Sequence, residues 1–349
     1  MKVSLHIGFT KTGTSQFQFS MSNSEKELAK QKIFYPESGR KFNAHHGLVN
    51  LLIQQRVNTA GEPTTDFNTL IKEIKEKEAK GFERTVISSE ALMLAKAPLE
   101  GLHKLISEFD VKVYAFVRPP ISWVNSMLNQ TYKNILYDRP HVDESIDQHG
   151  RAKRFIDAGM KFHRRLEVWE DIVGKANMVV ACLNPGDDFM STILDTMSIE
   201  LHDNIQRDFK SSNASFSAES LQYLAWLAKN KNVYNHDEKV RFMNILGDYS
   251  KISGTKVSNY IPPALWDLAI EKAKLSREKI SKHYFGGAEV LSEKLPFSTH
   301  FDFENYDPKI VLQVNSYVLM RLDRRIQEVR AMNSSPVNKV ISKIRNPKE

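Results

Sequence analysis

Short apolar runs rich in β-branched residues alternate with long amphipathic stretches in the first half of the chain, and this alternation limits the possible folds more than any other feature. Four such runs, at residues 3–7, 85–88, 111–117 and 178–183, predict strands. They are nearly continuous apolar runs without strict alternation, which is typical of a parallel sheet covered by helices on both faces. Strands separated by helices predict an α/β fold.

The remaining amphipathic stretches predict the helices and the division of the chain. They cover residues 13–29, 44–56, 64–79, 98–108, 120–137, 153–173, 216–231, 236–250, 263–284 and 307–331. After Leu183 the pattern is mostly helical. We therefore expect a single domain over 1–332, with an α/β core (1–185) and a mostly helical part (186–332) packed on it. Residues 333–349 are polar and basic and predict a frayed tail.

The composition narrows the classes of function. The chain has 349 residues, of which 41% are hydrophobic, and a formal net charge of +7. Such a mild excess suits an enzyme that handles polyanions and is weaker than the dense basic stripe of a nucleic-acid-binding protein, so no nucleic-acid partner is expected. A single cysteine, Cys182, excludes an intramolecular disulfide and a zinc site built from cysteines.

The start of the chain and its hydropathy predict a cytoplasmic protein. Residues 1–8 become polar too soon for a signal peptide, and no later run is apolar for long enough to span a membrane.

A loop rich in glycine and threonine follows the first predicted strand and opens the first predicted helix. It reads Gly8-Phe9-Thr10-Lys11-Thr12-Gly13-Thr14-Ser15. At such a place, backbone N–H groups and the positive end of the helix dipole converge on an anion. Gly13 allows the tight turn, Lys11 supplies a positive charge, and the hydroxyls of Thr12, Thr14 and Ser15 add donors. The loop therefore predicts a phosphate-binding site.

This loop differs from a Walker A motif. That motif places a lysine directly after its last glycine, whereas here Thr14 follows Gly13 and Lys11 precedes it. The predicted strand ends also lack an obvious aspartate for magnesium, so we expect no metal. An ordinary helix start explains a loop of this composition too, because Thr and Ser are good N-caps.

The same loop resembles the 5′-phosphosulfate loop of the sulfotransferases, which usually reads Pro-Lys-Thr-Gly-Thr-Thr/Ser after a first strand. Thr10 stands where the family often has proline. The resemblance implies that the donor is 3′-phosphoadenosine 5′-phosphosulfate (PAPS). It also implies that Lys11 neutralises the bridging oxygen as the sulfuryl group departs, while residues 12–15 hold the 5′-phosphate.

A second resemblance lies after the third predicted strand. Arg118 follows that strand, Pro119 and Pro120 suit the first turn of a helix, and Ser126 lies eight residues beyond Arg118. The run resembles the family's 3′-phosphate motif, an arginine after a strand, a proline and a downstream serine. It implies that Arg118 and Ser126 clamp the 3′-phosphate through charge-assisted hydrogen bonds. Taken singly, each also fits an ordinary position at or on a surface helix.

Weaker similarity to bacterial sulfotransferase-like proteins extends to a loop at 213–217, which a helix N-cap explains equally well. Together the resemblances imply a P-loop NTPase-like core with three α/β/α layers. Golgi-type members carry a membrane helix, so the expected absence of one favours a bacterial origin.

Sulfuryl transfer also requires a base for the acceptor's proton, and two candidates are open. Glu90 follows the second predicted strand, and a glutamate at a comparable place acts as base in heparan-type members of the family. His46 belongs to a His45-His46 pair, and cytosolic sulfotransferases use a histidine. Adjacent residues of a helix face different ways, so at most one of the pair enters a site. A first-turn carboxylate and a surface histidine are the structural alternatives.

The expected acceptor is a hydroxyl or amine of a saccharide or glycoconjugate, although no motif identifies it. Lys153, Arg154, Arg164 and Arg165 are candidates to meet an anionic glycan, but a solvated helix face explains them better. Two other functions stay open. One is a nucleotide-dependent kinase with a degenerate loop, and the other is an inactive nucleotide-binding protein.

Overall fold

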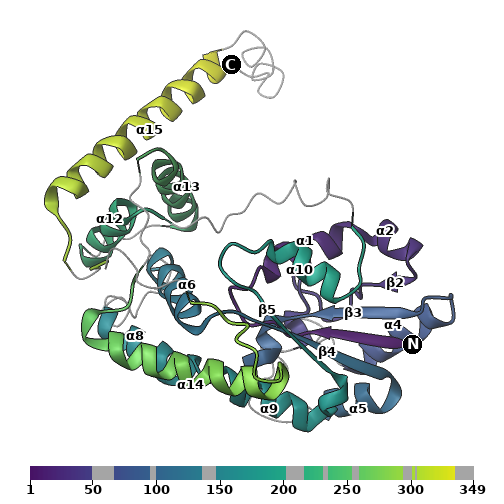
Figure 1. The fold of residues 1–349 in the computed structure, drawn as a ribbon. Coiled ribbons are helices and arrows are strands. Elements are labelled where there is room, and N and C mark those ends of the chain that lie inside the picture. The colour runs from purple at the N-terminus through teal and green to yellow at the C-terminus, as the bar shows by residue number, and fades with distance from the viewer. Residues whose placement is uncertain are drawn as a thin grey trace, which may run out of the picture. The chain divides into compact units, whose positions relative to one another are not determined.

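The four predicted strands and one further short strand form a parallel sheet in the order β2-β3-β1-β4-β5 (Figure 1). The strands are β1 (Lys2–His6), β2 (Ile33–Phe34), β3 (Arg84–Ser88), β4 (Asp110–Val117) and β5 (Met178–Cys182). This sheet confirms the predicted α/β class. The computed structural model describes residues 1–48, 67–94, 100–135, 147–201, 216–230, 235–253, 259–293, 301–302 and 305–334.

The chain divides into two compact units whose segments interleave along the sequence. Unit 1 comprises Met1–Ser126, Arg154–Ser212 and Trp266–Pro296, and unit 2 comprises Met127–Lys153, Asn213–Leu265 and Phe297–Glu349. All five strands lie in unit 1. Unit 1 also contains α14 (Trp266–Tyr284), which comes from the helical second half of the sequence.

Strand β1 lies at the centre of the sheet. Its burial on both faces explains why apolar and polar residues do not alternate strictly along it. It pairs in parallel with β3 and with β4, so that Leu5 lies between Ile87 and Val113. The small polar residue Ser4 and the imidazole of His6 are as buried as their apolar neighbours. Helices on both faces of a parallel sheet bury both sides of each strand.

Helices cover both faces of the sheet, a layout compatible with three α/β/α layers. On one side, α1 (Thr14–Asn23), α2 (Glu25–Lys30) and α10 (Phe189–Thr196) enclose a buried cluster (Figure 1). That cluster includes Phe17, Met21, Leu28, Val86, Phe116, Met190 and Ile193. On the other side, α5 (Glu100–Glu108) and α9 (Phe162–Val173) contact β4, and α4 (Phe67–Glu78) packs on α5.

Two predicted helices are divided in the structure. The helix expected at 13–29 breaks at Ser24, whose hydroxyl donates to the carbonyl of Ser20 and whose own carbonyl accepts from the first turn of α2. The helix expected at 153–173 is α8 (Gln148–Arg154), a π-helical turn at Phe155–Gly159, and α9. The turn brings Gly159 against Trp123, where a Cβ would collide with the indole.

Most other predicted helices are confirmed to within four residues at each described end. They are α4, α5, α6 (Pro120–Lys133), α12 (Ala218–Lys229), α13 (His236–Ser253), α14 and α15 (Pro308–Ser334). Helix α10 was not predicted, although Asp188 marks its start by accepting from the amides of Met190 and Ser191. The predictions for residues 49–56, 64–66, 98–99, 136–137, 213–215, 231 and 335–349 lie outside the described residues.

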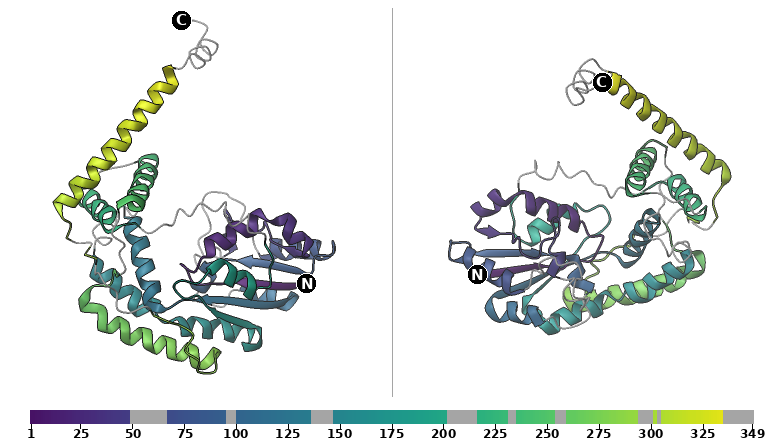
Figure 2. Two further views of the ribbon diagram at one scale, coloured as in Figure 1. Left: turned by 45° about the horizontal axis from the view of Figure 1, so that its top comes forward. Right: turned by 180° about the vertical axis from the view of Figure 1, so that it is seen from behind.

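Unit 2 is built from helices, and α15 packs along α12 and α13 (Figure 2). Hydroxyl groups join them: Tyr223 donates to Asn315 Oδ1 at 2.9 Å, and Ser220 donates to the Leu246 carbonyl at 3.1 Å. Within the described parts of both units, none of the helices is apolar over a length that would cross a bilayer.

Candidate functional site

Three segments singled out by the sequence meet at one edge of the sheet. Strands β3, β1 and β4 are parallel neighbours, so their carboxyl ends lie side by side. The loop at 8–15 follows β1, Glu90 follows β3 and Arg118 follows β4. Pairing continues past the strands, because the Ser89 amide donates to the His6 carbonyl at 3.0 Å. Ligands of open α/β sheets bind at this edge.

The loop after β1 is held by side chains that bond its carbonyl groups. The carbonyls of residues 9–11 accept in turn from the Thr12 hydroxyl, from Trp123 Nε1 at 3.1 Å and from Arg118 Nη1 at 2.7 Å. A trans peptide points its C=O and N–H in opposite directions. The amide of residue 11 therefore faces away from Trp123 and that of residue 12 away from Arg118, as expected for donors that line a concave loop.

Two residues of this loop have left-handed backbone conformations. Lys11 has φ 68°, and Gly13 has φ 74°. For a non-glycine residue this conformation costs about 1–2 kcal/mol. Gly13 begins α1 and lies against Phe189, where a Cβ would come within 3.1 Å of the Phe189 Cβ. The first-turn amides of residues 14–15 have no acceptor within the helix and remain available to an anion.

Positive charge is concentrated beside the loop. Burial lowers the pKa of Arg118 to about 10, with Glu293 opposing the shift, and the buried Arg118 Nε has no hydrogen-bond partner in the part of the chain that the structure describes. Burial also lowers the pKa of Lys11, and the Arg118 cation lowers it further. An anion between these groups would offset both effects and supply an acceptor for Nε.

Glu293 is a site residue that the sequence analysis missed. Its carboxylate accepts from the amides of Ile121 at 2.8 Å and Ser122 at 3.3 Å, so it caps the N-terminus of α6. Burial raises its pKa, while these hydrogen bonds oppose the change. No local signal links Glu293 to α6, because 172 positions separate it from Ile121. The amides of Ile121 and Ser122 thus already have an acceptor, which leaves the loop after β1 and Arg118 as the candidate donors to an anion at this edge.

Ser126 lies on α6, half-buried and three residues beyond Trp123. Within the described residues, no hydrogen bond joins Ser126 to Arg118. The structure therefore places Arg118 in contact with the loop after β1. Ser126 lies on α6, about one helical turn beyond Trp123.

The two candidate bases form one pair. Glu90 opens a short 3₁₀ turn (Glu90–Leu94) after β3, and its Oε2 accepts from Gln18 Nε2 at 2.8 Å. His46 Nε2 lies 3.7 Å from Glu90 Oε1, and His46 Nδ1 lies 2.8 Å from Ser89 Oγ. Both side chains are partly accessible, 33% for His46 and 17% for Glu90. Gln18 belongs to α1, so the pair is tied to the helix that the loop opens.

His45 has a structural role instead. The Ser88 amide donates to His45 Nδ1 at 3.1 Å, which places the proton on Nε2 for donation to the Pro36 carbonyl at 3.0 Å. Burial lowers the pKa of His45 to about 4 and that of His6, bonded to Ser88 Oγ at 2.7 Å, to about 3. These two imidazoles are therefore neutral, and each forms a hydrogen bond with Ser88 at the end of β3.

The lowered pKa values of His6 and His45 predict that acid destabilises the folded protein. The unfolded histidines bind protons from about pH 6.5 downward, whereas the folded ones resist protonation until about pH 3–4. The free energy of unfolding should therefore decrease as pH falls, by about 2 kcal/mol per histidine at about pH 5. His45→Gln should remove about half of this decrease, measured by urea unfolding at about pH 7.5 and about pH 5. An unchanged pH dependence in that variant would contradict the assignment.

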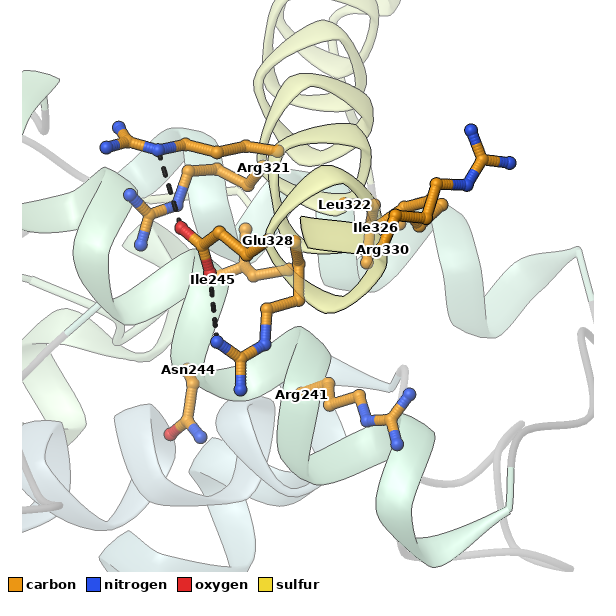
Figure 3. A pocket seen from close by; sticks show the side chains of 10 residues that line it. Arg241, Asn244, Ile245, Arg321, Leu322, Ile326, Glu328 and Arg330 are labelled. Carbon is orange, nitrogen blue, oxygen red and sulfur yellow. Dashed lines mark hydrogen bonds and ion pairs between the residues drawn. The ribbon is translucent and has the colours of Figure 1, made fainter. Parts of the chain in front are cut away.

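Another cavity belongs to unit 2. It has a volume of about 970 Å³ and lies between α13 and α15 of unit 2 (Figure 3). Three of its arginines have carboxylate partners: Arg324 and Arg325 pair with Glu328 at 3.6 and 2.9 Å, and Arg321 pairs with Asp248 at 3.0 Å. None of the residues predicted to bind the donor lines it.

Four basic residues were candidates to contact an anionic glycan, and one of them, Arg165, lies against Phe9 of the loop after β1. The Arg165 guanidinium lies 5.8 Å from the Phe9 ring, and none of the described residues forms a hydrogen bond with its buried Nη1. A solvated helix face is therefore the wrong interpretation for Arg165, although Lys153, Arg154 and Arg164 are exposed.

Comparisons with known proteins add no relative to this picture. No protein-family model matches the chain, and no curated protein or solved structure shows significant similarity to it. The fold and the site define it as an α/β protein with a cationic loop at the carboxyl edge of a parallel sheet.

Proposed function

We propose that this protein is a PAPS-dependent sulfotransferase with a P-loop NTPase-like three-layer core. One observation carries the proposal: Arg118 Nη1 donates to the Lys11 carbonyl at 2.7 Å. That bond joins two segments, 107 residues apart, that the sequence separately relates to the two ends of one nucleotide. A cytoplasmic location and a saccharide or glycoconjugate acceptor belong to the same proposal.

The residues divide into three roles. The amides of residues 10–15 and the Lys11 ammonium would bind the 5′-phosphosulfate, while Arg118, with Ser126 nearby, would bind the 3′-phosphate. The Glu90–His46 pair would take the acceptor's proton. Partial accessibility of that pair and its link to α1 through Gln18 support this role.

The reaction is an in-line displacement at sulfur. The acceptor oxygen or nitrogen forms a bond to sulfur as the bond from sulfur to the 5′-phosphate oxygen breaks. The electron pair of the broken bond stays on that oxygen, where Lys11 stabilises the charge. The acceptor's proton passes to the Glu90–His46 pair. Positioning and electrostatics supply most of the rate, as in phosphoryl transfer.

Calorimetry distinguishes this function from its alternatives. A sulfotransferase should bind adenosine 3′,5′-bisphosphate without added metal and more tightly than ATP with magnesium. A kinase should show the reverse preference. An inactive nucleotide-binding protein should bind the bisphosphate but transfer no label from radiolabelled PAPS to a panel of saccharides.

Arg118 supplies a quantitative test of the 3′-phosphate site. Arg118→Ala should weaken bisphosphate binding about 10- to 100-fold, because hydrogen bonds to charged groups contribute about 1.5–3 kcal/mol. Arg118→Lys should recover only part of this loss, because an ammonium lacks the planar fork of donors. Titration calorimetry measures both.

Arg84 is the matched control for Arg118. It is also half-buried with a pKa lowered by burial, but it begins β3 at the opposite edge of the sheet. Arg84→Lys should leave the bisphosphate affinity unchanged. An equal loss in both variants would show that the effect of Arg118 is structural and would contradict its assignment.

A further inference from the structure

A second cationic cavity lies within unit 1, between α9 and α14 and beside the π-helical turn. Its volume is about 240 Å³. Four cationic side chains and one imidazole line it, together with apolar residues: Lys161, Arg164, Lys272, Lys279 and His163. Its described lining contains no carboxylate.

The cations of this cavity lack the neutralising partners found elsewhere. Across the described residues, no ion pair involves Lys161, Arg164, Lys272 or Lys279. The arginine-rich cavity of unit 2 differs, because Glu328 and Asp248 neutralise three of its cations. A concave surface with uncompensated charge of one sign raises the local concentration of the opposite ion.

His163 adds a buried polar group to this charge. Its side chain is 6% exposed, and its Nε2 lies 3.4 Å from Lys279 Nζ. An ammonium only donates, so Nε2 accepts and the proton of the neutral ring lies on Nδ1. Among the described residues that buried Nδ1 has no hydrogen-bond partner. The imidazole thus presents Nε2, rather than Nδ1, to the lysine of this cavity.

Most charged neighbours of this imidazole oppose its protonation. Burial lowers the pKa of His163, and Lys279, Arg164 and Lys161 lower it further, while Glu167 acts in the opposite direction. A bound anion would reverse the balance. It would accept from Lys279 and favour a proton on His163 Nε2, which would become a second donor.

We propose that the cavity between α9 and α14 binds the phosphate or sulfate ester group of a small acidic ligand. Its volume of about 240 Å³ is below the roughly 300–1,000 Å³ of pockets for drug-sized molecules, so it suits a monosaccharide ester rather than a nucleotide. The inference does not depend on the proposed transferase activity, because none of the donor-loop residues lines the cavity.

The test uses the full chain carrying Lys11→Gly, which removes the cation of the loop after β1. N-acetylglucosamine 6-sulfate and N-acetylglucosamine 6-phosphate are titrated by calorimetry, with the unsubstituted sugar and inorganic sulfate as separate arms. The esters should bind and the unsubstituted sugar should not. Adding Lys272→Gln and Lys279→Gln should weaken ester binding about tenfold or more. Thermal unfolding of each variant confirms that it is folded.

A matched pair of substitutions controls for net charge. Arg324→Gln with Arg325→Gln removes two cations from the arginine-rich cavity of unit 2 and should leave ester affinity unchanged. Equal losses from the two double variants, equal binding of the unsubstituted sugar, or binding of inorganic sulfate alone would overturn the proposal.

His163 supplies an independent readout. Because a bound anion raises its pKa, binding takes up a proton, and affinity for the sulfate ester, whose own charge is constant in this range, should increase as pH falls from about 7.5 to about 5.5. His163→Gln should still bind but lose this increase. An unaltered pH dependence in that variant would remove His163 from the site.

Discussion

Replacing Glu90 by glutamine is expected to lower the rate of sulfuryl transfer by about 10²- to 10⁴-fold, the usual contribution of a positioned base. The amide keeps the size of the carboxylate, and its carbonyl oxygen still accepts from Gln18 Nε2. Folding should therefore be preserved while the group that takes the acceptor's proton is lost. The rate is measured as transfer of label from radiolabelled PAPS to a panel of saccharides, with the wild-type protein as the reference.

The neighbouring histidine provides the comparison that separates the two candidate bases. If Glu90 takes the proton, His46→Gln should cost less than Glu90→Gln, because His46 then only orients the carboxylate from 3.7 Å. Chemical rescue sharpens the distinction: formate should restore part of the activity of Glu90→Ala, and imidazole should not restore that of His46→Ala. Rescue of His46→Ala by imidazole, with Glu90→Gln nearly active, would assign the base to His46.

Lys11→Gly should lower kcat/KM by about 10²- to 10³-fold, the usual loss when a group that stabilises developing charge is removed. Glycine is the informative substitution because Lys11 has φ 68°. Glycine adopts this conformation without the cost of about 1–2 kcal/mol that a lysine pays. The loop should therefore keep its shape and the protein its stability while the charge is lost.

Lys32 is a matched control for Lys11. It also has a left-handed backbone, with φ 57°, but it is exposed before β2, where it pairs with Glu83. Lys32→Gly should leave transfer unchanged, and thermal unfolding should show both variants to be folded. If Lys11→Gly retained full transfer, or if both variants lost it equally, the role of Lys11 in stabilising the leaving group would be wrong.

The local elements were readable from the sequence because their signals are local. Strand β4 (Asp110–Val117) was predicted to within one residue from its apolar run, and Pro119–Pro120 correctly indicated the start of α6. Strand β2 is two residues long and offers too short a run to detect. The division of the helix at 153–173 was also missed, because the collision of Trp123 with any side chain at position 159 is a tertiary effect.

In the candidate site, too, the sequence predicts only those features whose signals are local. Sequence spacing singled out Lys11, Arg118, Glu90 and His46, but it left the last two as alternatives. The structure places them 3.7 Å apart, because His45 is fixed by Ser88 and Pro36 and thereby orients its neighbour. Glu293 had no signal, since capping α6 requires a chain segment far away in the sequence.

The sequence by itself determined which of the predicted segments become strands and helices. It also determined which residues have side chains whose charge could attract an anion. Periodicity and turn chemistry act over a few residues, and they are sufficient for that. Only the tertiary structure decided that β1 lies between β3 and β4, which brings the ends of three strands to one edge. Strand order depends on the packing of helices on both faces of the sheet, and that packing is the sum of many contacts between residues distant in the sequence.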